Sequence, residues 1–251
     1  MIRASNMRRS LNSLHLNLTH MWVKVGICGI PRRGGLDVAE TQETFYDLVS
    51  EERLRNWANR VPEFTVKALQ VITHSATSPT YRRMRRFKGN PDNFGEFKVN
   101  EDTVKALEAT LEEARKLGAR LIVFQTPNSF TFQRGKDRVA QFWSILSRNF
   151  TYCWEPRGWS EEEVTYVLQR TGFIHAVDPF RNRSLSTLKY YRLHGLVMYR
   201  YEFTSEDFIK LRGMLGEENY VMFNNLTALR DALKFKELLV NTGGHLAGSF
   251  P

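Results

Sequence analysis

The sequence predicts an α/β fold in which eight parallel strands close into a (β/α)8 TIM-like barrel. Short apolar runs alternate with amphipathic segments over about 230 residues, a pattern typical of β–α–β units around a parallel sheet. Eight strand candidates in a chain of 251 residues favour a closed barrel over an open sheet. No glycine-rich phosphate-binding motif follows the first strand candidate, which argues against a dinucleotide-binding fold.

The strand candidates are short and apolar. Residues 120–125 (RLIVFQ) are apolar on both faces, as a strand buried in a parallel sheet should be. The other candidates, in chain order, are 22–28, 39–45, 64–69, 150–155, 173–178, 189–194 and 220–224. The link at 31–38 is shorter than the about 10–12 residues of an ordinary crossover, so we expect the first helix to be a turn or absent.

Helices are expected between the strands because several segments carry capping residues. Asn100 precedes an amphipathic segment that Gly118 ends. Ser160 and Glu163 have the spacing of a capping box, and Gly172 ends the helix that follows. The helices are expected at about 51–60, 101–117, 137–148, 160–171, 205–215 and 227–240.

We expect one barrel domain over residues 22–240. Residues 1–21 hold three arginines and no acid, and polar residues break what would be a secretory apolar core. They are expected to be a disordered extension or the product of a start codon placed too early, with an organellar targeting peptide as the alternative. The glycine-rich residues 241–251 are expected to form a flexible tail.

The composition is that of a globular protein, with 42% hydrophobic and 25% charged residues. The net charge of +9 favours anionic partners. No stretch reaches the about 18–20 apolar residues that span a bilayer, so no membrane partner is expected. Cys28 and Cys153 are too few for a disulfide scaffold or a cysteine-rich zinc site and suit a reducing, cytoplasmic location. The oligomeric state is left open.

Polar residues stand at the carboxyl ends of the predicted strands, where the active site of a barrel lies. Because buried polar groups without partners cost free energy, the set is informative although each member is weak alone. The set comprises Cys28, Arg32, Arg33, Glu40, Gln42, Lys67, Thr73, His74, Gln125, Glu155, Arg157, Asp178, Arg192, His194, Asn224 and Asn225.

Lys67 interrupts an apolar strand candidate. A lysine that points into a barrel either pairs with a carboxylate, here Glu40 or Glu155, or has its pKa lowered by desolvation. A buried lysine–glutamate pair that only specifies the fold is the structural alternative.

Three residues suit proton exchange and anion binding. Glu155 and His194 have side chains that act as general acids or bases, and Arg157 suits an oxyanion or phosphate. The alternative is that Glu155 and Arg157 only fix a loop and that His194 is structural. Asn224 and Asn225 suit hydrogen bonds to a substrate or, alternatively, a cap on the last helix.

No cofactor is predicted, and a divalent metal stays open. Its ligands would come from Glu40, His74, Glu155, Asp178 and His194, since carboxylates and imidazoles are common metal ligands. No HExxH or CxxC motif supports such a site.

Residues 75–99 form a long loop that should lie over the barrel mouth. They carry six basic residues against two acids, with four aromatic residues interleaved. Arginines with aromatic residues bind phosphates and stack on bases, and long loops in compact domains are usually functional. We expect a lid that attracts anions, through Arg82, Arg83, Arg85 and Arg86; a solvated lid or an interface element is the alternative.

Several motifs resemble the YecE-like family, catalogued as domain of unknown function 72. They occur in the family's order and are GICG at 26–29, ETQETFY at 40–46, FTVKALQVITH at 64–74, EPRGW at 155–159, YRLHG at 191–195 and FNN at 223–225. The resemblance covers about residues 22–240 and implies a TIM-like barrel without a settled reaction. The chain departs from the family at the short link 31–38 and at Gly158, where members often have histidine.

The family motifs contain many of the polar residues at the strand ends. We take the candidate site mainly from the residues that belong to both sets. The catalytic candidates are Lys67, Glu155 and His194. The substrate-binding candidates are Glu40, His74, Gln125, Arg157, Arg192, Asn224 and Asn225.

Two functions of different classes follow. The first is an enzyme, a hydrolase, isomerase or lyase, acting by acid–base chemistry on a phosphorylated or other anionic small molecule such as a sugar or nucleotide. Arg157 and Arg192 would bind the anion, Glu155 and His194 would exchange protons, and Lys67 would be an electrophile or a Schiff-base amine. The alternative is a nucleic-acid-binding or nuclease-like protein that uses loop 75–99, and the fold alone does not choose between them.

Overall fold

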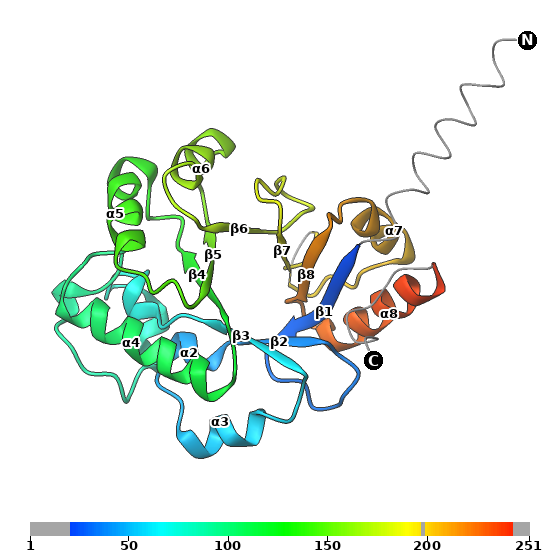
Figure 1. Ribbon diagram of the computed structural model, residues 1–251, viewed down its shortest axis with the longest axis horizontal. Coiled ribbons are helices and arrows are strands. Elements are labelled where there is room, and N and C mark those ends of the chain that lie inside the picture. The colour runs from blue at the N-terminus through cyan, green and yellow to red at the C-terminus, as the bar shows by residue number, and fades with distance from the viewer. Residues whose placement is uncertain (1–20, 197–198, 243–251) are drawn as a thin grey trace, which may run out of the picture.

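The computed structural model describes residues 21–196 and 199–242, and its eight strands form one closed barrel in which neighbours in sequence are neighbours in space (Figure 1). The first and last strands pair in parallel from Trp22 opposite Glu218 to Ile27 opposite Phe223, which closes the barrel. The predicted fold class is therefore confirmed. The strands are β1 (Trp22–Cys28), β2 (Val38–Thr41), β3 (Glu63–Lys67), β4 (Leu121–Thr126), β5 (Thr151–Pro156), β6 (Ile174–Val177), β7 (Lys189–Leu193) and β8 (Glu218–Phe223).

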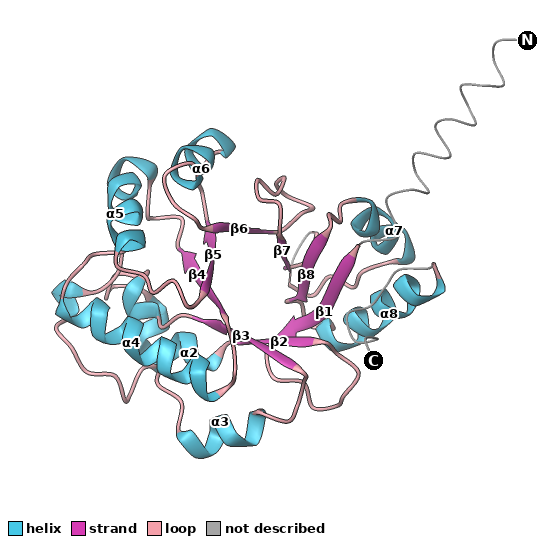
Figure 2. Ribbon diagram, viewed as in Figure 1, coloured by secondary structure: helices cyan, strands magenta, loops and turns pink. Residues whose placement is uncertain are grey.

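Helices lie around the outside of the barrel (Figure 2). They are α2 (Glu43–Tyr46), α3 (Glu51–Trp57), α4 (Glu101–Lys116), α5 (Phe132–Ser144), α6 (Glu161–Leu168), α7 (Ser205–Gly213) and α8 (Ala228–Asn241), with 3-10 turns η1 (Gln70–Ile72), η2 (Pro79–Arg83) and η3 (Pro91–Asn93). Asn100 and Ser160 cap α4 and α6, as predicted; Ser160 forms the predicted capping box with Glu163, and Asn100 forms a further one with Thr103. No described helix is both long and apolar enough to cross a lipid bilayer.

Two predicted elements differ from the structure. The strand expected at 39–45 ends at Thr41, because the chain turns into α2 and the Thr44 hydroxyl donates to the Lys67 carbonyl at 2.7 Å. The helix expected at 137–148 runs instead from Phe132 to Ser144, and its added first turn includes the buried Gly135. The expectations for residues 1–20 and 243–251 lie outside the described residues.

The short link between β1 and β2 contains no helix, as predicted. Gly26 lets the two strands approach, because a Cβ there would lie 2.0 Å from the carbonyl oxygen of Val38. Asp37 then ties the link down: its carboxylate accepts from the Val25 amide at 3.0 Å and from the Lys236 ammonium at 2.6 Å. The Asp37 carboxylate therefore anchors a link that has no helix to pack against the barrel.

The interior of the barrel changes from apolar to polar along its axis. An apolar layer made by Val38, Leu121, Val123, Cys153, Ala176, Tyr190, Tyr220 and Met222 fills the middle. Two residues further along each strand, side chains return to the same face. At those positions β2, β3, β4, β5 and β7 carry Glu40, Lys67, Gln125, Glu155 and Arg192, all buried. The carboxyl end of the barrel therefore holds a buried polar layer directly below its mouth.

Candidate active site

Arg192 is the centre of the buried polar layer. Its guanidinium is fully buried and binds Glu40 bidentately, with Nε to Oε2 at 3.0 Å and Nη2 to Oε1 at 2.7 Å. Its Nη1 donates to the amide oxygen of Gln125 at 3.0 Å and to the carboxylate of Glu155. The Tyr190 hydroxyl also donates to Glu40, at 2.9 Å. One buried cation therefore orients two carboxylates that come from opposite sides of the barrel.

The electrostatics of this cluster favour charged forms. Burial alone would lower the pKa of Arg192, but Glu155 and Glu40 raise it well above its usual range. Burial alone would raise the pKa of Glu155, but Arg192 and then Arg157 hold it well below its usual range. Glu155 therefore stays a carboxylate at physiological pH, which suits it to positioning better than to proton transfer.

Lys67 has no such partner. Glu40 and Glu155, the partners considered from the sequence, bind Arg192, and within the described residues Lys67 forms no ion pair. Its ammonium instead lies 4.0 Å from the centre of the Phe45 ring. Burial, and next the charge of Arg192, lower the pKa of Lys67 to about 7. Of the two environments predicted for this lysine, the structure has the desolvated one.

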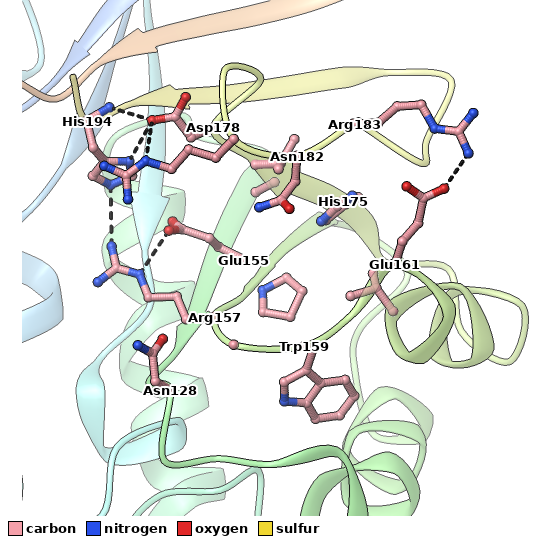
Figure 3. Close-up of a pocket in the computed structure, with 16 residues that line it drawn as sticks. Asn128, Glu155, Arg157, Trp159, Glu161, His175, Asp178, Asn182, Arg183 and His194 are labelled. Carbon is pink, nitrogen blue, oxygen red and sulfur yellow. Dashed lines mark hydrogen bonds and ion pairs between the residues drawn. The ribbon is translucent and has the colours of Figure 1, made fainter. Parts of the chain in front are cut away.

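A second set of polar contacts runs along the mouth from Glu155 through Arg157 and His194 to Asp178 (Figure 3). Glu155 accepts from Nε of Arg157 at 3.1 Å, and Nη2 of Arg157 lies 3.4 Å from Nε2 of His194. Asp178 then accepts from the His194 amide at 3.1 Å, with Nδ1 of the ring 3.7 Å from the same carboxylate. The turn at Gly158 has φ of +78°, a conformation that would strain the histidine often found there in the family.

Two cavities open at this mouth, and Arg157 lines both of them. The first holds about 370 Å³ and lies between the ends of β5, β6 and β7 (Figure 3). The second holds about 620 Å³ and lies over β3 and β4. Predicted residues in the first are Glu155, Arg157 and His194; in the second they are Lys67, His74, Gln125, Arg157 and Asn224.

His74 is neutral in the second cavity. Burial, followed by the charge of Lys67, lowers the pKa of His74 to about 3. Its Nδ1 lies 2.9 Å from the Thr73 hydroxyl, and the edge of its ring contacts Phe45. The cavity over β3 therefore presents an uncharged imidazole beside a lysine whose pKa is lowered.

Three of the ten catalytic and substrate-binding candidates line neither cavity. Glu40 and Arg192 lie beneath the mouth in the buried layer. Asn225 is turned into the β8–α8 connection, where its amide donates to Asp231 at 2.7 Å and to the Tyr201 carbonyl at 2.7 Å. Asn225 therefore ties the β8–α8 connection to the first turn of α8 through side-chain contacts, although the N-cap position of that helix is Thr227.

Sequence reasoning missed several residues of the first cavity. They are Asn128, Trp159, Glu161, His175, Arg181, Asn182 and Arg183. His175 lies inside β6, and burial lowers its pKa to about 4. A single histidine within an apolar strand candidate is a signal that the sequence does offer. The two arginines follow β6 in a loop without a motif, so only the tertiary structure brings them to the site.

Loop 75–99 is packed against the barrel. Phe87, Phe94 and Phe97 are buried, and Tyr81 stacks on Phe94 with ring centres 5.4 Å apart. The three phenylalanine rings are therefore part of the core and are not available to stack on bases. The four arginines at positions 82, 83, 85 and 86 are exposed, and Arg83 lines the second cavity.

The carboxylates and imidazoles suggested as metal ligands do not form a metal centre. Across residues 21–196 and 199–242, no group of three or more His, Cys, Asp or Glu side chains has an arrangement that could hold a metal ion. Glu40 and Glu155 bind Arg192 instead, since both are nearly fully buried around its guanidinium.

A profile of the family described as protein of unknown function DUF72 matches residues 33–249. The chain belongs to this family. The match confirms the predicted resemblance, and it begins after β1, the strand that completes the barrel. No curated protein matches the chain significantly.

Solved structures resemble this DUF72 chain in fold. SacUVDE superposes with a TM-score of 0.56 at 11% identity, covering 93% of this chain and 85% of its own. A xylose isomerase domain containing protein from Salmonella typhimurium LT2 gives 0.51 at 13% identity, covering 82% and 87%. Endonuclease IV from Thermus thermophilus gives 0.45 at 12% identity, covering 87% and 99%. The first two share the barrel fold, and the third is too distant to carry an argument.

Proposed function

We propose that this DUF72 protein is an enzyme whose barrel mouth binds a phosphorylated or other anionic small molecule and transfers protons on it. Hydrolysis, isomerisation and lyase cleavage are the reaction classes that these side chains serve. The observation that supports the proposal is the chain from Glu155 through Arg157 to His194 along the wall of a 370 Å³ cavity. This volume is within the range of small-molecule sites.

Arg157 is the group proposed to bind the anion. Its side chain is 41% exposed and borders both cavities. Two of its nitrogens contact Glu155 and His194, whereas Nη1 has no hydrogen bond among the described residues. A guanidinium held in place on one edge and open on the other suits recognition of a carboxylate or phosphate.

His194 is the group proposed to transfer protons, with Asp178 as its positioning residue. The imidazole is 20% exposed at the cavity wall, so a substrate can reach it. The Asp178 carboxylate fixes the backbone of His194 and faces its Nδ1, which favours one orientation of the ring. Glu155 and Arg192 are assigned to positioning, because each is buried and paired.

A thermal-shift titration tests anion binding. Glycerol 3-phosphate, sugar phosphates and nucleotides are the probes, and a ligand at a hundred times its Kd stabilises the fold by about 2.7 kcal/mol. We expect Arg157→Gln to abolish the shift and Arg55→Gln to leave it intact, because Arg55 is exposed on α3 and the charge change is the same. Equal responses of the two variants, or no shift with any probe, would contradict the proposal.

Turnover is tested on the probes that bind. Phosphorus and proton NMR in D2O report hydrolysis, isomerisation, cleavage and solvent-proton exchange in one sample. We expect His194→Ala to retain binding and to lose about 10²–10⁴-fold in rate, the usual contribution of a general acid or base. An unchanged rate would remove His194 from the mechanism.

Nucleic-acid binding is the second candidate, and the four exposed arginines of loop 75–99 support it. Replacing Arg82, Arg83, Arg85 and Arg86 with glutamine should then weaken oligonucleotide binding and flatten its salt dependence. Fluorescence anisotropy at several salt concentrations measures both. Identical salt slopes for the variant and the unmodified protein would exclude this candidate.

A further inference from the structure

We infer that Lys67 condenses with a carbonyl group of the substrate, so that the anionic small molecule is an aldehyde or a ketone. This inference deepens the proposed function and rests on it for the placement of the anion on Arg157. It concerns the larger cavity over β3 and β4.

The backbone places the amine where a substrate can reach it. Lys67 is the last residue of β3, and Thr65, two residues earlier, contacts Tyr190 in the interior at 2.7 Å. Alternation along the strand therefore directs Lys67 into the same interior, one layer nearer the mouth. Lys67 is one of the residues that line the 620 Å³ cavity, although only 5% of it is exposed.

The surroundings leave this amine without an ionic partner. The two nearby carboxylates, Glu40 and Glu155, are bound to Arg192. Among the described residues the Lys67 ammonium has neither an ion pair nor a hydrogen bond, and the Phe45 ring covers one side of it at 4.0 Å. The Lys67 amine is therefore not part of a buried salt bridge among the described residues.

Its protonation state suits nucleophilic attack. An ordinary lysine has a pKa near 10.4, so only about one in 2,500 is a free amine at pH 7. Burial lowers the pKa of Lys67 to about 7, so that about half of the molecules carry the reactive amine. Enzymes that form Schiff bases lower the pKa of their lysine by the same two causes, desolvation and a neighbouring cation.

The cavity wall supplies the other groups that a carbonyl substrate needs. Arg157 lies at its border and suits the anionic end. The side-chain amides of Gln125 and Asn224 line the same space and suit hydrogen bonds to the carbonyl or hydroxyl oxygens. A substrate of a few carbons between an anion and a carbonyl would span from Arg157 to Lys67.

The reaction balances without a cofactor. The lone pair of the Lys67 nitrogen forms a bond to the carbonyl carbon, and the π electrons move to the oxygen. That oxygen takes the proton released by the nitrogen and one further proton from solvent, and it leaves as water. The product is a protonated imine, whose positive charge withdraws electrons from the neighbouring C–H or C–C bond.

Reductive trapping of the full chain tests the inference. The probes are two matched pairs of anions, dihydroxyacetone phosphate with glycerol 3-phosphate and pyruvate with lactate, in which only one member has a carbonyl. Each is incubated at pH 7 with cyanoborohydride, which reduces an imine to a stable secondary amine, and the modified lysine is located by peptide mass spectrometry. We expect at least about tenfold more adduct on Lys67 than on the exposed Lys105 of α4, and none with the partners that lack the carbonyl.

The outcomes separate this inference from the proposed function. If glycerol 3-phosphate or lactate stabilises the protein and no carbonyl probe modifies Lys67 preferentially, the site binds anions and the Schiff-base inference is overturned. If no probe of either kind stabilises the protein and none is trapped, the proposed function fails as well. Because adducts are located in the unmodified sequence, the result does not depend on whether Lys67→Met folds. Where that variant folds, the peptide that contains residue 67 should carry no adduct, and Lys105 should be modified to the same small extent as in the unmodified protein.

Discussion

The two halves of the barrel mouth differ in whether their ionisable side chains have partners of opposite charge. On the side of β5, β6 and β7, every acid of the site has a basic partner: Glu155 binds Arg157 and Arg192, and Asp178 faces His194. On the side of β3, Lys67 and His74 have no carboxylate partner among the described residues, and burial pushes both toward their neutral forms. One mouth therefore combines a charged wall at β5, β6 and β7, suited to holding an anion, with a neutral wall at β3, suited to nucleophilic chemistry.

The largest expected effect on stability comes from removing the central cation of the charged half. Arg192→Met leaves Glu40 and Glu155 buried without their cation, and breaking a buried pair from one side costs about 3–5 kcal/mol. Urea unfolding should show a free energy of unfolding lower by that amount. A loss below about 1 kcal/mol would mean that the cluster is not the main source of order in this layer. Arg55→Met on the exposed face of α3 is the matched control and should change little.

Replacing Lys67 on the β3 side should stabilise the protein near pH 6, whereas replacing Arg192 should destabilise it. The pKa of Lys67 is lowered in the folded state to about 7, so between pH 7 and 10 the unfolded chain binds more protons and stability rises with pH. Lys67→Met lacks this dependence. We expect the stability of the variant relative to the unmodified protein to be highest near pH 6 and to fall by up to about 4 kcal/mol as the pH approaches 10. Chemical unfolding across this range measures it, and a constant difference would contradict the assigned pKa.

The pKa of Lys67 is also open to direct measurement. Amine labelling by a small acylating reagent follows the fraction of free amine, so the rate at Lys67 should have its midpoint near pH 7. Exposed lysines such as Lys105 should keep accelerating up to about pH 10. A midpoint for Lys67 above pH 9 would mean that an anionic group stabilises its ammonium form. The two halves of the mouth would then not differ in how their charges are paired.

His74 should give a smaller effect on the acid side. Its pKa is lowered to about 3, so below about pH 6.5 the unfolded chain takes up a proton that the folded chain does not, and stability falls as the pH falls. The slope is at most about 1.4 kcal/mol per pH unit. His74→Gln should reduce the loss between pH 6 and 4 in chemical unfolding. An identical acid profile for the variant would show that His74 titrates normally.

Much of the fold and part of the site follow from the sequence. Alternating apolar and amphipathic segments and the caps at Asn100 and Ser160 predict the barrel and several of its helix ends, because these depend on local periodicity and local hydrogen bonds. The polar strand ends predict the mouth, because parallel strands in a barrel deliver their carboxyl ends to one face. Boundaries such as that of β2 were missed, since the turn after Thr41 depends on a hydrogen bond from Thr44 to β3.

Tertiary structure alone decided which charges pair. Nothing local distinguishes Lys67 from Arg192 as the partner of Glu40 and Glu155; the barrel closes so that the planar guanidinium of Arg192 reaches both carboxylates and Lys67 is left against Phe45. The packing of loop 75–99 was equally non-local: its phenylalanines are buried, Phe97 against Phe124 of β4, whereas its four arginines are exposed. The sequence by itself determined where polar groups gather, since strand order and alternation are encoded locally. Which of them are charged, paired or free depends on burial and distances that exist only once the barrel is closed.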